Sequence, residues 1–288
     1  MTITTCNQCG SADRKSLFVK NGYELVECAQ CHLAYISNPP TAMELAEIYS
    51  AAADYHQDIR DPSSKTGKRM GEIADRHLEV LQKEAQSGRV IDVGCSIGLF
   101  VDRAKRAGFG AQGIEFSNDA ASFARNLGLN VATGSIHDVK GEDGQFDIVT
   151  MFDVIEHVPD PSLDMKAAYR LLKPGGLFLQ STPNIDGLFP QISYPVAHKV
   201  DYWTHPEPPY HLYQFSVKTL TAMLEKTGFE VGATYHFNMD LSYSFGSIET
   251  LKAHPKMLAY AALFAPFAKV GPWIGQGDWI YTAARKPK

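Results

Sequence analysis

The segment that decides the fold is Val90-Ile91-Asp92-Val93-Gly94-Cys95-Ser96-Ile97-Gly98-Leu99-Phe100. An apolar strand leads into a glycine turn and then a helix, which presents backbone N–H groups to a nucleotide-like ligand. A dinucleotide fingerprint would need glycine at positions 94, 96 and 99, but Ser96 and Leu99 occupy the last two. The spacing therefore argues against a pyrophosphate-binding turn. What remains is Asp92 followed by a short turn of small residues.

A second acidic residue, Glu115, follows the strand-like run from 111 to 114. It comes about 20 residues after the turn, where an α/β nucleotide site places the acid that accepts hydrogen bonds from ribose hydroxyls. We predict that role for Glu115, and Phe116 is placed to lie against an adenine ring. A glycine turn without a ligand is the alternative for the opening motif alone, because isolated motif matches are weak.

Strands and helices alternate along the rest of the chain, which predicts crossover units and hence a parallel sheet. An amphipathic helix from about 68 to 84 is expected to cover one face of that sheet. Predicted strands lie at 90–93, 111–115, 146–151, 177–184, 229–237 and 279–284, and predicted helices at 98–107, 118–127, 162–172 and 216–227.

The order of these motifs resembles class I S-adenosylmethionine-dependent methyltransferases. Their first motif is usually Asp/Glu-x-Gly-x-Gly-x-Gly, from which this chain departs only at Ser96, a residue small enough to keep the turn tight. The run from Gln145 to Asn184 resembles their fourth strand, Glu-His-Val segment, helix, Leu-Lys-Pro-Gly-Gly turn and fifth strand. The resemblance implies an α/β, Rossmann-like fold with a mostly parallel seven-stranded sheet whose last strand is antiparallel.

The same resemblance implies S-adenosylmethionine as cofactor. Asp92 would face the methionine ammonium group, and Ser135 and Ile136 would contact the adenine through backbone groups. Cys95 lies in the cofactor loop, where packing as a small apolar residue is the expected role of its thiol. The predicted cofactor-binding residues are Asp92, Gly94, Cys95, Ser96, Gly98, Glu115, Phe116, Ser135, Ile136, Phe152 and Asp153.

Methyl transfer requires a nucleophile aligned with the sulfonium methyl group and a base that removes its proton. Histidine is the side chain best suited to that task near neutral pH. His157, next to Glu156, and His211 from a later loop are the two candidates. For each, hydrogen bonding to backbone in order to hold a loop is an equally good interpretation. Glu156 would orient His157 or bind a metal ion.

Four cysteines occur as Cys6-x-x-Cys9 and Cys28-x-x-Cys31, a spacing typical of a four-thiolate zinc site. A disulfide framework is the competing explanation, disfavoured because the rest of the chain is no small secreted scaffold. Four thiolates leave no open position, so the zinc ion would be structural. This segment looks like the zinc-ribbon leader found ahead of certain bacterial small-molecule methyltransferases.

We therefore divide the chain into a zinc-ribbon module (1–40), a connector (41–68) and a methyltransferase domain (69–288). The connector carries Tyr49 and Tyr55, which either cover the cofactor or pack against the domain. Two insertions, 183–215 and 238–277, are expected to form a lid beside the carboxyl ends of the strands. The first carries Tyr194, His198, Tyr202, Trp203, His205, Tyr210, His211 and Tyr213.

The composition of the chain limits the classes of binding partner that we expect. The formal charge is −5 and no run of lysine or arginine occurs, so we expect no nucleic acid as substrate. The first residues lack a basic segment followed by an apolar one, which favours a cytoplasmic protein. The apolar run from Met257 to Ala268 is too short to span a bilayer. It packs on the core, rests on a membrane surface or covers a greasy substrate.

These observations predict a methyltransferase acting on a small organic acceptor, with oxygen of a sugar, polyol or phenolic metabolite as the first choice. Carbon and nitrogen acceptors stay open. An NAD-dependent dehydrogenase is disfavoured by the missing glycines. A non-catalytic zinc-ribbon adaptor that recruits nucleic acid or protein is disfavoured by the acidic balance. The oligomeric state is left open.

Overall fold

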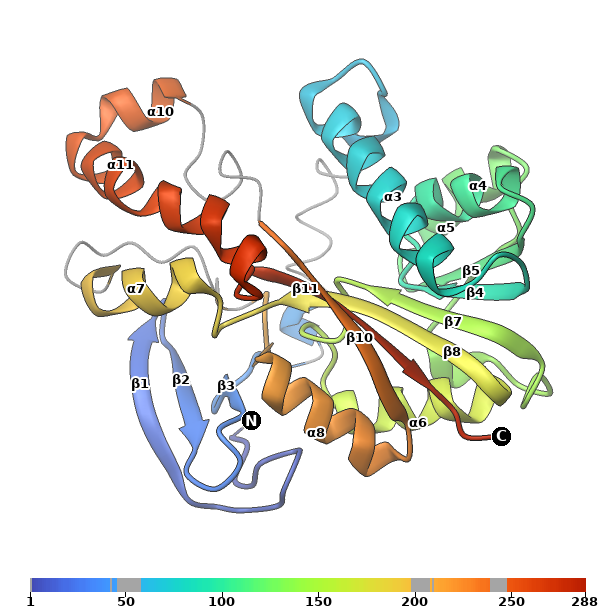
Figure 1. The fold of residues 1–288 in the computed structure, drawn as a ribbon, viewed down its shortest axis with the longest axis horizontal. Coiled ribbons are helices and arrows are strands. Elements are labelled where there is room, and N and C mark those ends of the chain that lie inside the picture. The colour runs from blue at the N-terminus through green and yellow to red at the C-terminus, as the bar shows by residue number, and fades with distance from the viewer. Residues whose placement is uncertain (1, 42, 46–57, 198–207, 209, 239–247) are drawn as a thin grey trace.

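The seven-stranded sheet at the centre of the computed structural model has the strand order β10-β11-β8-β7-β4-β5-β6. Strands β4 to β8 are parallel, whereas β11 is antiparallel to both its neighbours. This confirms the predicted mostly parallel sheet with an antiparallel last strand. Helices α3, α4 and α5 lie on one face and α6 and α8 on the other (Figure 1).

The structure describes residues 2–41, 43–45, 58–197, 208, 210–238 and 248–288. Its strands are β1 Arg14–Lys20, β2 Tyr23–Cys28, β3 Ala34–Ile36, β4 Arg89–Val93, β5 Gly110–Glu115, β6 Val131–Thr133, β7 Phe146–Phe152, β8 Leu172–Pro183, β9 Tyr213–Gln214, β10 Glu230–Phe237 and β11 Trp279–Arg285. Its helices are α3 Lys65–Glu84, α4 Leu99–Arg106, α5 Asn118–Asn126, η1 Ile136–Asp138, α6 Pro161–Leu171, α7 Leu188–Ala197, α8 Val217–Thr227, α10 Ile248–Ala253, α11 Pro255–Val270 and η3 Gly271–Ile274.

The central strands are apolar runs because helices cover both faces of the sheet. Successive side chains point to opposite faces, so Val90 and Ile91 of β4 enter different clusters. Val90 packs with Ile148 under α3 and α4. Ile91 packs with Val149 on the side of α6 and α8. Both cores therefore hold β4 in place and fix the turn at its carboxyl end.

Capping residues set the helix ends. The Ser216 hydroxyl accepts a hydrogen bond from the backbone N–H of Thr219 and starts α8, and Gly228, with φ 106°, ends it. This confirms the helix predicted there. Strand β8 begins earlier than predicted, at Leu172. Residues 173–176 form a bulge within it, because the partners in β8 jump from Leu172 to Leu177 between Phe146 and Ile148 of β7.

The N-terminal segment is joined to the main domain rather than merely preceding it. Strands β1, β2 and β3 form an antiparallel sheet whose fourth strand is β9. The backbone N–H of Ile36 also donates to the carbonyl of Leu212, at 2.9 Å. Cys6 and Tyr35 pack in the same cluster as Met165 and Phe178 of the main domain. The N-terminal sheet is thereby fixed to the main domain on the side of α6 and α8.

Candidate active site

The turn after β4 is built from residues in the left-handed region: Gly94 (φ 72°), Ser96 (φ 49°) and Gly98 (φ 82°). A side chain at Gly94 would place its Cβ 2.5 Å from Cγ2 of Val154, and one at Gly98 would lie 2.6 Å from Cδ1 of Leu129. Glycine is therefore required at both positions. Ser96 adopts the same conformation at a cost, since the left-handed region is unfavourable for residues with a Cβ.

Glu115, at the end of β5, lies directly beside this turn. Its carboxylate accepts hydrogen bonds from the backbone N–H groups of Ser96 and Ser117, each at 2.8 Å. The acid predicted from its distance along the sequence is thus brought against the turn by the parallel pairing of β4 with β5. Phe116 follows it with its ring 75% exposed, open to a planar ligand.

Asp92 is buried under the turn and is 4% exposed. It accepts a hydrogen bond of 2.6 Å from the hydroxyl of Thr150, its neighbour in register on β7. Burial raises the pKa of Asp92 to about 7, although the bond from Thr150 opposes this, and the charge of Glu115 adds to it. A cation beside Asp92 would favour its ionised form.

The side chains of the remaining predicted cofactor residues differ in their exposure to solvent. The Cys95 thiol is buried next to Gly113, where burial raises its pKa, and it packs with Val101. The Ile136 side chain is buried in the core. Ser135 uses its N–H and hydroxyl to bind the carboxylate of Asp138, both at 2.8 Å. Contacts of these residues with a cofactor remain predictions.

Phe152 and Asp153, at the end of β7, have different environments. The Phe152 ring is buried and stacked on His77 of α3, with ring centroids 4.0 Å apart, so it belongs to the core. Asp153 has φ 57° and accepts hydrogen bonds from the Ser181 hydroxyl and, at 2.8 Å, from Nε1 of Trp279. Burial raises the pKa of Asp153 to about 6 against the effect of these donors. Strained backbone of this kind clusters at functional sites.

The two predicted histidines meet although 54 positions separate them in sequence. Their ring centroids are 4.7 Å apart at an interplanar angle of 79°. His157 Nδ1 lies 2.7 Å from the carbonyl oxygen of Tyr210. The backbone N–H groups of Leu212 and Tyr213 donate to the carbonyl of Glu156, at 2.8 and 3.1 Å. These bonds attach the His211 loop to the Glu156–His157 segment.

Glu156 completes this cluster. One of its carboxylate oxygens accepts from the Thr182 hydroxyl at 3.0 Å, and the other lies 3.9 Å from His157 Nε2. Burial, with the nearby charge of Asp153, raises the pKa of Glu156 well above its ordinary value. Burial also lowers the pKa of His157, which the carbonyl of Tyr210 opposes. A buried cluster of this kind favours a neutral imidazole, the form that accepts a proton.

One ligand atom from each of Glu156, His157 and His211 lies within 4.8 Å of the others. Two imidazoles and a carboxylate are ligands that bind divalent transition metals. The same combination of side chains can also transfer a proton. The sequence had brought Glu156 and His157 together as neighbours in the chain. Only the folded chain adds His211.

The four N-terminal cysteines converge as predicted. All are free thiols, and their sulfur atoms lie within 4.8 Å of one another. Cys6 and Cys31 are 3.5 Å apart and Cys9 and Cys28 3.4 Å. A disulfide would need about 2.05 Å, whereas four sulfurs each at about 2.3 Å from zinc are roughly 3.8 Å apart. The arrangement fits a tetrahedral metal site far better than a disulfide framework.

Each cysteine pair sits on a tight turn. The N–H of Gly10 donates to the Cys6 carbonyl at 2.8 Å, and that of His32 to the Cys28 carbonyl at 3.0 Å. Gly10 and His32 both have positive φ, 79° and 65°. Burial raises the pKa of Cys28, but N–H groups of Cys31 and Gln30 outweigh this and bring it down to about 7. Such N–H groups favour the thiolate that metals bind.

Several residues of this site were not predicted from the sequence. Thr150 is a lone hydroxyl in an apolar strand, which was an available signal. Ser181 reaches Asp153 through the pairing of β8 with β7, and Trp279 through the pairing of β11 with β8, and neither contact has a local signal in the sequence. The predictions for Tyr49, Tyr55, His198, Tyr202, Trp203 and His205 lie outside the described residues.

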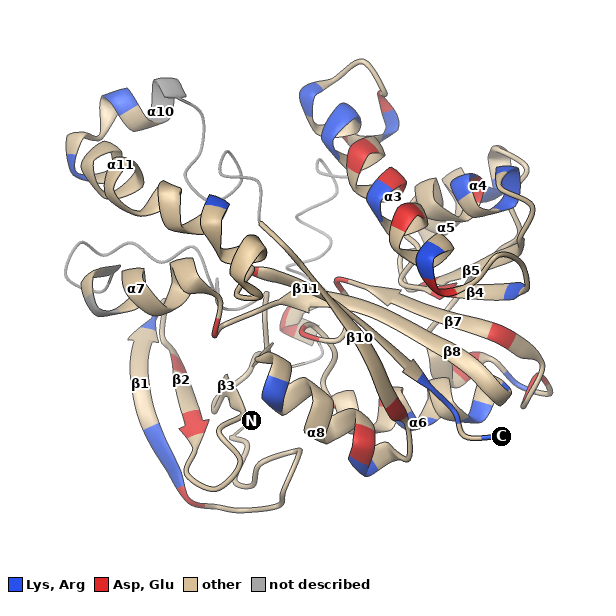
Figure 2. Ribbon diagram, viewed as in Figure 1, with Lys and Arg blue, Asp and Glu red and all other residues tan. Residues whose placement is uncertain are grey.

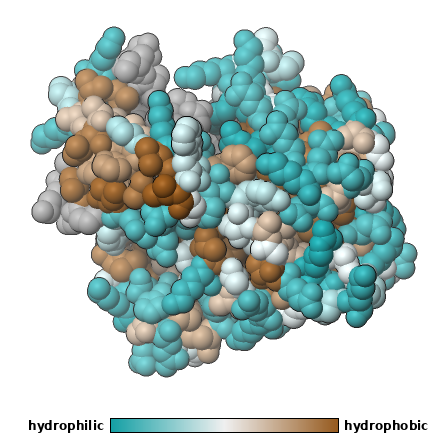
Figure 3. Space-filling view, in the orientation of Figure 1, coloured by the Kyte–Doolittle hydropathy of each residue, from teal (hydrophilic) through white to brown (hydrophobic). Residues whose placement is uncertain are grey.

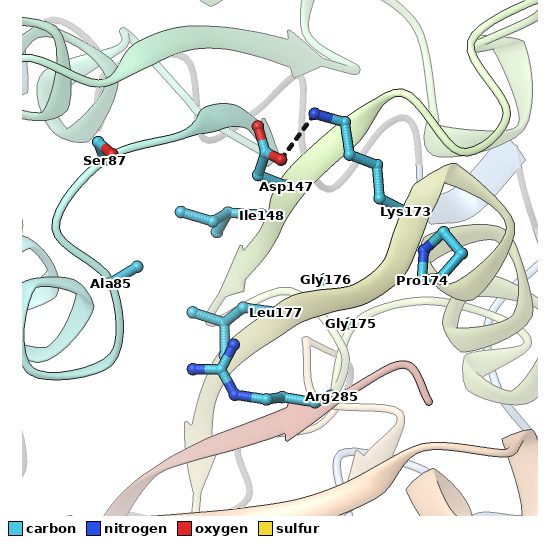
Figure 4. Close-up of a pocket in the computed structure, with 10 residues that line it drawn as sticks. All are labelled: Ala85, Ser87, Asp147, Ile148, Lys173, Pro174, Gly175, Gly176, Leu177 and Arg285. Atoms are coloured by element: carbon cyan, nitrogen blue, oxygen red, sulfur yellow. Dashed lines mark hydrogen bonds and ion pairs between the residues drawn. The ribbon is translucent and has the colours of Figure 1, made fainter. Parts of the chain in front are cut away.

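A shallow pocket occurs at the opposite edge of the sheet (Figure 4). It is lined by Asp147, Lys173, Arg285 and neighbouring residues, with Lys173 Nζ 2.6 Å from the Asp147 carboxylate. Asp147 lies near the amino end of β7, whereas open α/β sheets bind ligands at the carboxyl ends. This pocket is therefore separate from the site described above.

Comparisons with known proteins agree with this geometry. A family model described as a methyltransferase domain matches residues 66–234. The ubiquinone biosynthesis O-methyltransferase of Methylococcus capsulatus is 39% identical over 103 residues, which is 33% of this chain and 44% of that protein. The chain spans about half the length of the curated relatives it matches.

Solved structures show the same fold at low identity. A SAM-dependent methyltransferase from Thermotoga maritima aligns with a TM-score of 0.52 and 19% identity, covering 84% of this chain and 96% of that one. The [4+2]-cyclase SpnF aligns with a TM-score of 0.56 and 18% identity, covering 86% and 98%. Because one fold supports such different reactions, the chemistry has to be argued from the site.

Proposed function

Because this chain belongs to the family of class I S-adenosylmethionine-dependent methyltransferases, we propose that it methylates a hydroxyl oxygen of a small organic acceptor, a sugar, polyol or phenolic metabolite. The observation that carries this proposal is the meeting of His157 and His211 beside Glu156. The glycine turn touches Val154, two residues before Glu156, so the cofactor turn and the histidines share one edge of the sheet. Oxygen as acceptor is supported by relatives named O-methyltransferases.

The cofactor residues follow from the chemistry of each end of S-adenosylmethionine. The Glu115 carboxylate would accept hydrogen bonds from the ribose hydroxyls. It is held beside the turn by hydrogen bonds from the backbone N–H groups of Ser96 and Ser117, which supports this role. The buried Asp92 would meet the ammonium group, which supplies the positive charge its surroundings lack. The exposed ring of Phe116 would lie along the adenine.

When bound, S-adenosylmethionine supplies an electrophilic methyl group on a positively charged sulfur. The chain's own task is then to orient the acceptor and take its proton. A carbonyl oxygen only accepts, so His157 Nδ1, 2.7 Å from the Tyr210 carbonyl, carries the hydrogen of the neutral ring. Nε2 is consequently the nitrogen that accepts a proton. An imidazolium at His157 would favour the ionised form of Glu156, whose carboxyl oxygen lies 3.9 Å from Nε2, and would so oppose the burial that raises the Glu156 pKa.

His211 stands edge-on to this ring on the loop that also carries Tyr210. It orients the acceptor hydroxyl or serves as the base in place of His157. The four cysteines are proposed to bind a structural zinc ion that fixes β2 and β3. Through the bond from Ile36 to Leu212, that ion would also support the His211 loop.

Titration calorimetry of the zinc-loaded chain with S-adenosylhomocysteine tests the cofactor assignment. We expect binding that Glu115→Gln weakens at least tenfold, because an amide has no charge with which to bind two hydroxyls. Glu79→Gln, at an exposed glutamate on α3, is the matched control and should bind as the unaltered chain does. Absence of binding by the unaltered chain refutes the proposal.

The acceptor atom is tested separately. The enzyme is incubated with deuterated-methyl cofactor and a panel of catechols, sugars, polyols and primary amines, and products are located by mass spectrometry. Label on oxygen supports the proposal. Label on nitrogen or carbon alone would instead assign this chain to the other acceptor classes.

A further inference from the structure

Helix α11 and the following turn η3 are apolar on all sides yet poorly covered. Within the described residues, one segment, Pro255–Ile274, is long and apolar enough to cross a bilayer, and 28% of its most apolar 18-residue window is buried. A core helix of this composition would be mostly buried. The α-helical part, α11, has sixteen residues and rises about 24 Å, and one of its sides packs against Phe189 of α7, so a helix that lies on a membrane fits this packing better than one that crosses it.

One side of α11 is occupied by the protein. Tyr260, Ala261, Phe264 and Ala268 pack against Phe189 of α7, and the two helices lie side by side beyond the sheet (Figure 1). Away from this contact, α11 and η3 present five apolar side chains to solvent, spaced one to seven residues apart. These are Leu258, Leu263, Val270, Trp273 and Ile274, with Trp273 91% and Leu263 61% exposed. Figure 3 shows this area as one of the brown regions of the surface.

Along α11 and η3 the charged side chains have one sign, and the acidic residue that precedes them is Glu249 of α10. From Leu251 to Gly277 the sequence contains Lys252, Lys256 and Lys269, and neither Asp nor Glu. Lys256 precedes Leu258, the first of these apolar side chains, and Lys269 lies among them next to Val270. Figure 2 shows the same distribution along α11. Lysines flanking apolar side chains, with a tryptophan at the border, are typical of helices at anionic membrane surfaces.

The surface is continuous with the active site. The N–H of Leu188 donates to the carbonyl of Gln276 at 2.8 Å, and the side chain of Asn184 donates to Gly277 at 2.8 Å. Two residues further on, Trp279 binds Asp153. The apolar row therefore ends five residues before Trp279, whose side chain contacts Asp153 at the carboxyl end of β7.

We propose that α11 and η3 dock this protein onto the surface of a bilayer containing anionic phospholipid. Trp273 and the leucines enter the interface between headgroups and acyl chains, and the three lysines bind lipid phosphates. A second copy of this chain is a poorer occupant, because a two-fold interface would bury this surface against itself, and the segment from Leu251 to Gly277 offers its lysines no acidic partner. The proposal does not depend on which acceptor is methylated.

The test is co-sedimentation of the full chain with vesicles of phosphatidylglycerol and phosphatidylcholine in equal parts, and with phosphatidylcholine alone. We expect binding to the anionic vesicles only, weakened by salt, with a blue shift of the fluorescence of Trp273. Replacing Leu263 and Trp273 by serine should weaken binding at least tenfold. Changing the three lysines to glutamine should weaken it about 100-fold, at roughly fivefold per lysine.

Leu127→Ser is the matched control, because Leu127 is 60% exposed on the far side of the sheet, after α5. It should bind vesicles as the unaltered chain does, and all variants should still bind S-adenosylhomocysteine. No binding to anionic vesicles, or binding that the two α11 variants leave unchanged, overturns the proposal. A dimer that the Leu263 and Trp273 variant dissociates, without vesicle binding, would assign this surface to a second copy.

Discussion

Replacing Asp92 by asparagine should make the cofactor-free protein more stable above neutral pH. Asp92 is 4% exposed, and its pKa rises from 3.8 to about 7 on folding because the carboxylate is buried. The folded chain therefore holds this proton more tightly than the unfolded chain. Its contribution to stability is complete below about pH 4 and is lost as the pH rises through 7. The pKa difference of about 3 sets that loss at up to about 4 kcal/mol.

Asparagine keeps an oxygen that accepts the hydrogen bond from Thr150 and cannot ionise. Urea unfolding without cofactor should thus give Asp92→Asn a free energy of unfolding higher by up to about 4 kcal/mol at pH 8 and equal to the unaltered chain at pH 4. Thr150→Val should act in the opposite direction at pH 8, because it removes the donor to the ionised carboxylate. Glu79→Gln, at an exposed position of α3, should change neither value.

The same substitution should weaken binding of S-adenosylhomocysteine by about 10- to 100-fold, since a hydrogen-bonded charge is removed from its ammonium group. Binding by the unaltered chain should weaken as the pH falls below 7, because protonated Asp92 has no charge to offer. If Asp92 only packed in the core, its replacement would not raise stability and lower affinity together. The combination of higher stability and weaker S-adenosylhomocysteine binding therefore indicates that its carboxylate binds the cofactor. Lower stability of Asp92→Asn at pH 8, or an unchanged pH dependence, would refute the assignment.

Three further predictions concern other parts of the site. Cys9→Ser should abolish binding of the proposed zinc ion, measured by atomic absorption, and lower turnover at least tenfold with cofactor affinity unchanged, since that ion would support the His211 loop through β3; unchanged turnover in zinc-free protein would contradict this. His157→Gln should lower kcat by about 10²- to 10⁴-fold and abolish the fall in turnover that the unaltered enzyme shows as the pH drops through the lowered pKa of His157. If the variant keeps this fall in turnover at low pH, the base is another residue, and His211→Gln is the comparison. Ser96→Gly should raise the free energy of unfolding by about 1 kcal/mol, because glycine adopts φ 49° without strain, and a decrease in urea unfolding would show that the serine side chain stabilises the turn.

Much of this fold followed from local pattern. The strand before Gly94, the Glu115 that follows the next strand, and the capped helix from Ser216 to Gly228 are each encoded by neighbouring residues. Apolar periodicity and glycine or capping residues act within a few positions, so a single stretch of sequence carries enough information to predict them. The cysteine pairs belong to the same class, because each turn positions its own two thiols.

The sequence did not predict which of these local units would touch. Strand β9 joins the N-terminal sheet, and Trp279 reaches Asp153 across the pairing of β11 with β8. His211 meets His157 only because its loop is hydrogen-bonded to Glu156. Each contact joins residues more than 50 positions apart, and its geometry is set by strand register and packing of the whole core.

The sequence by itself determined the parallel α/β architecture, the cofactor turn with its two acids, and the four-cysteine cluster. The tertiary structure alone decided that two histidines share one site with Glu156, and that the outer side of α11 stays uncovered. The physical reason is range: turns, caps and periodicity arise from interactions between near neighbours in the chain. Burial and long-range contacts exist only once every element has packed against the others.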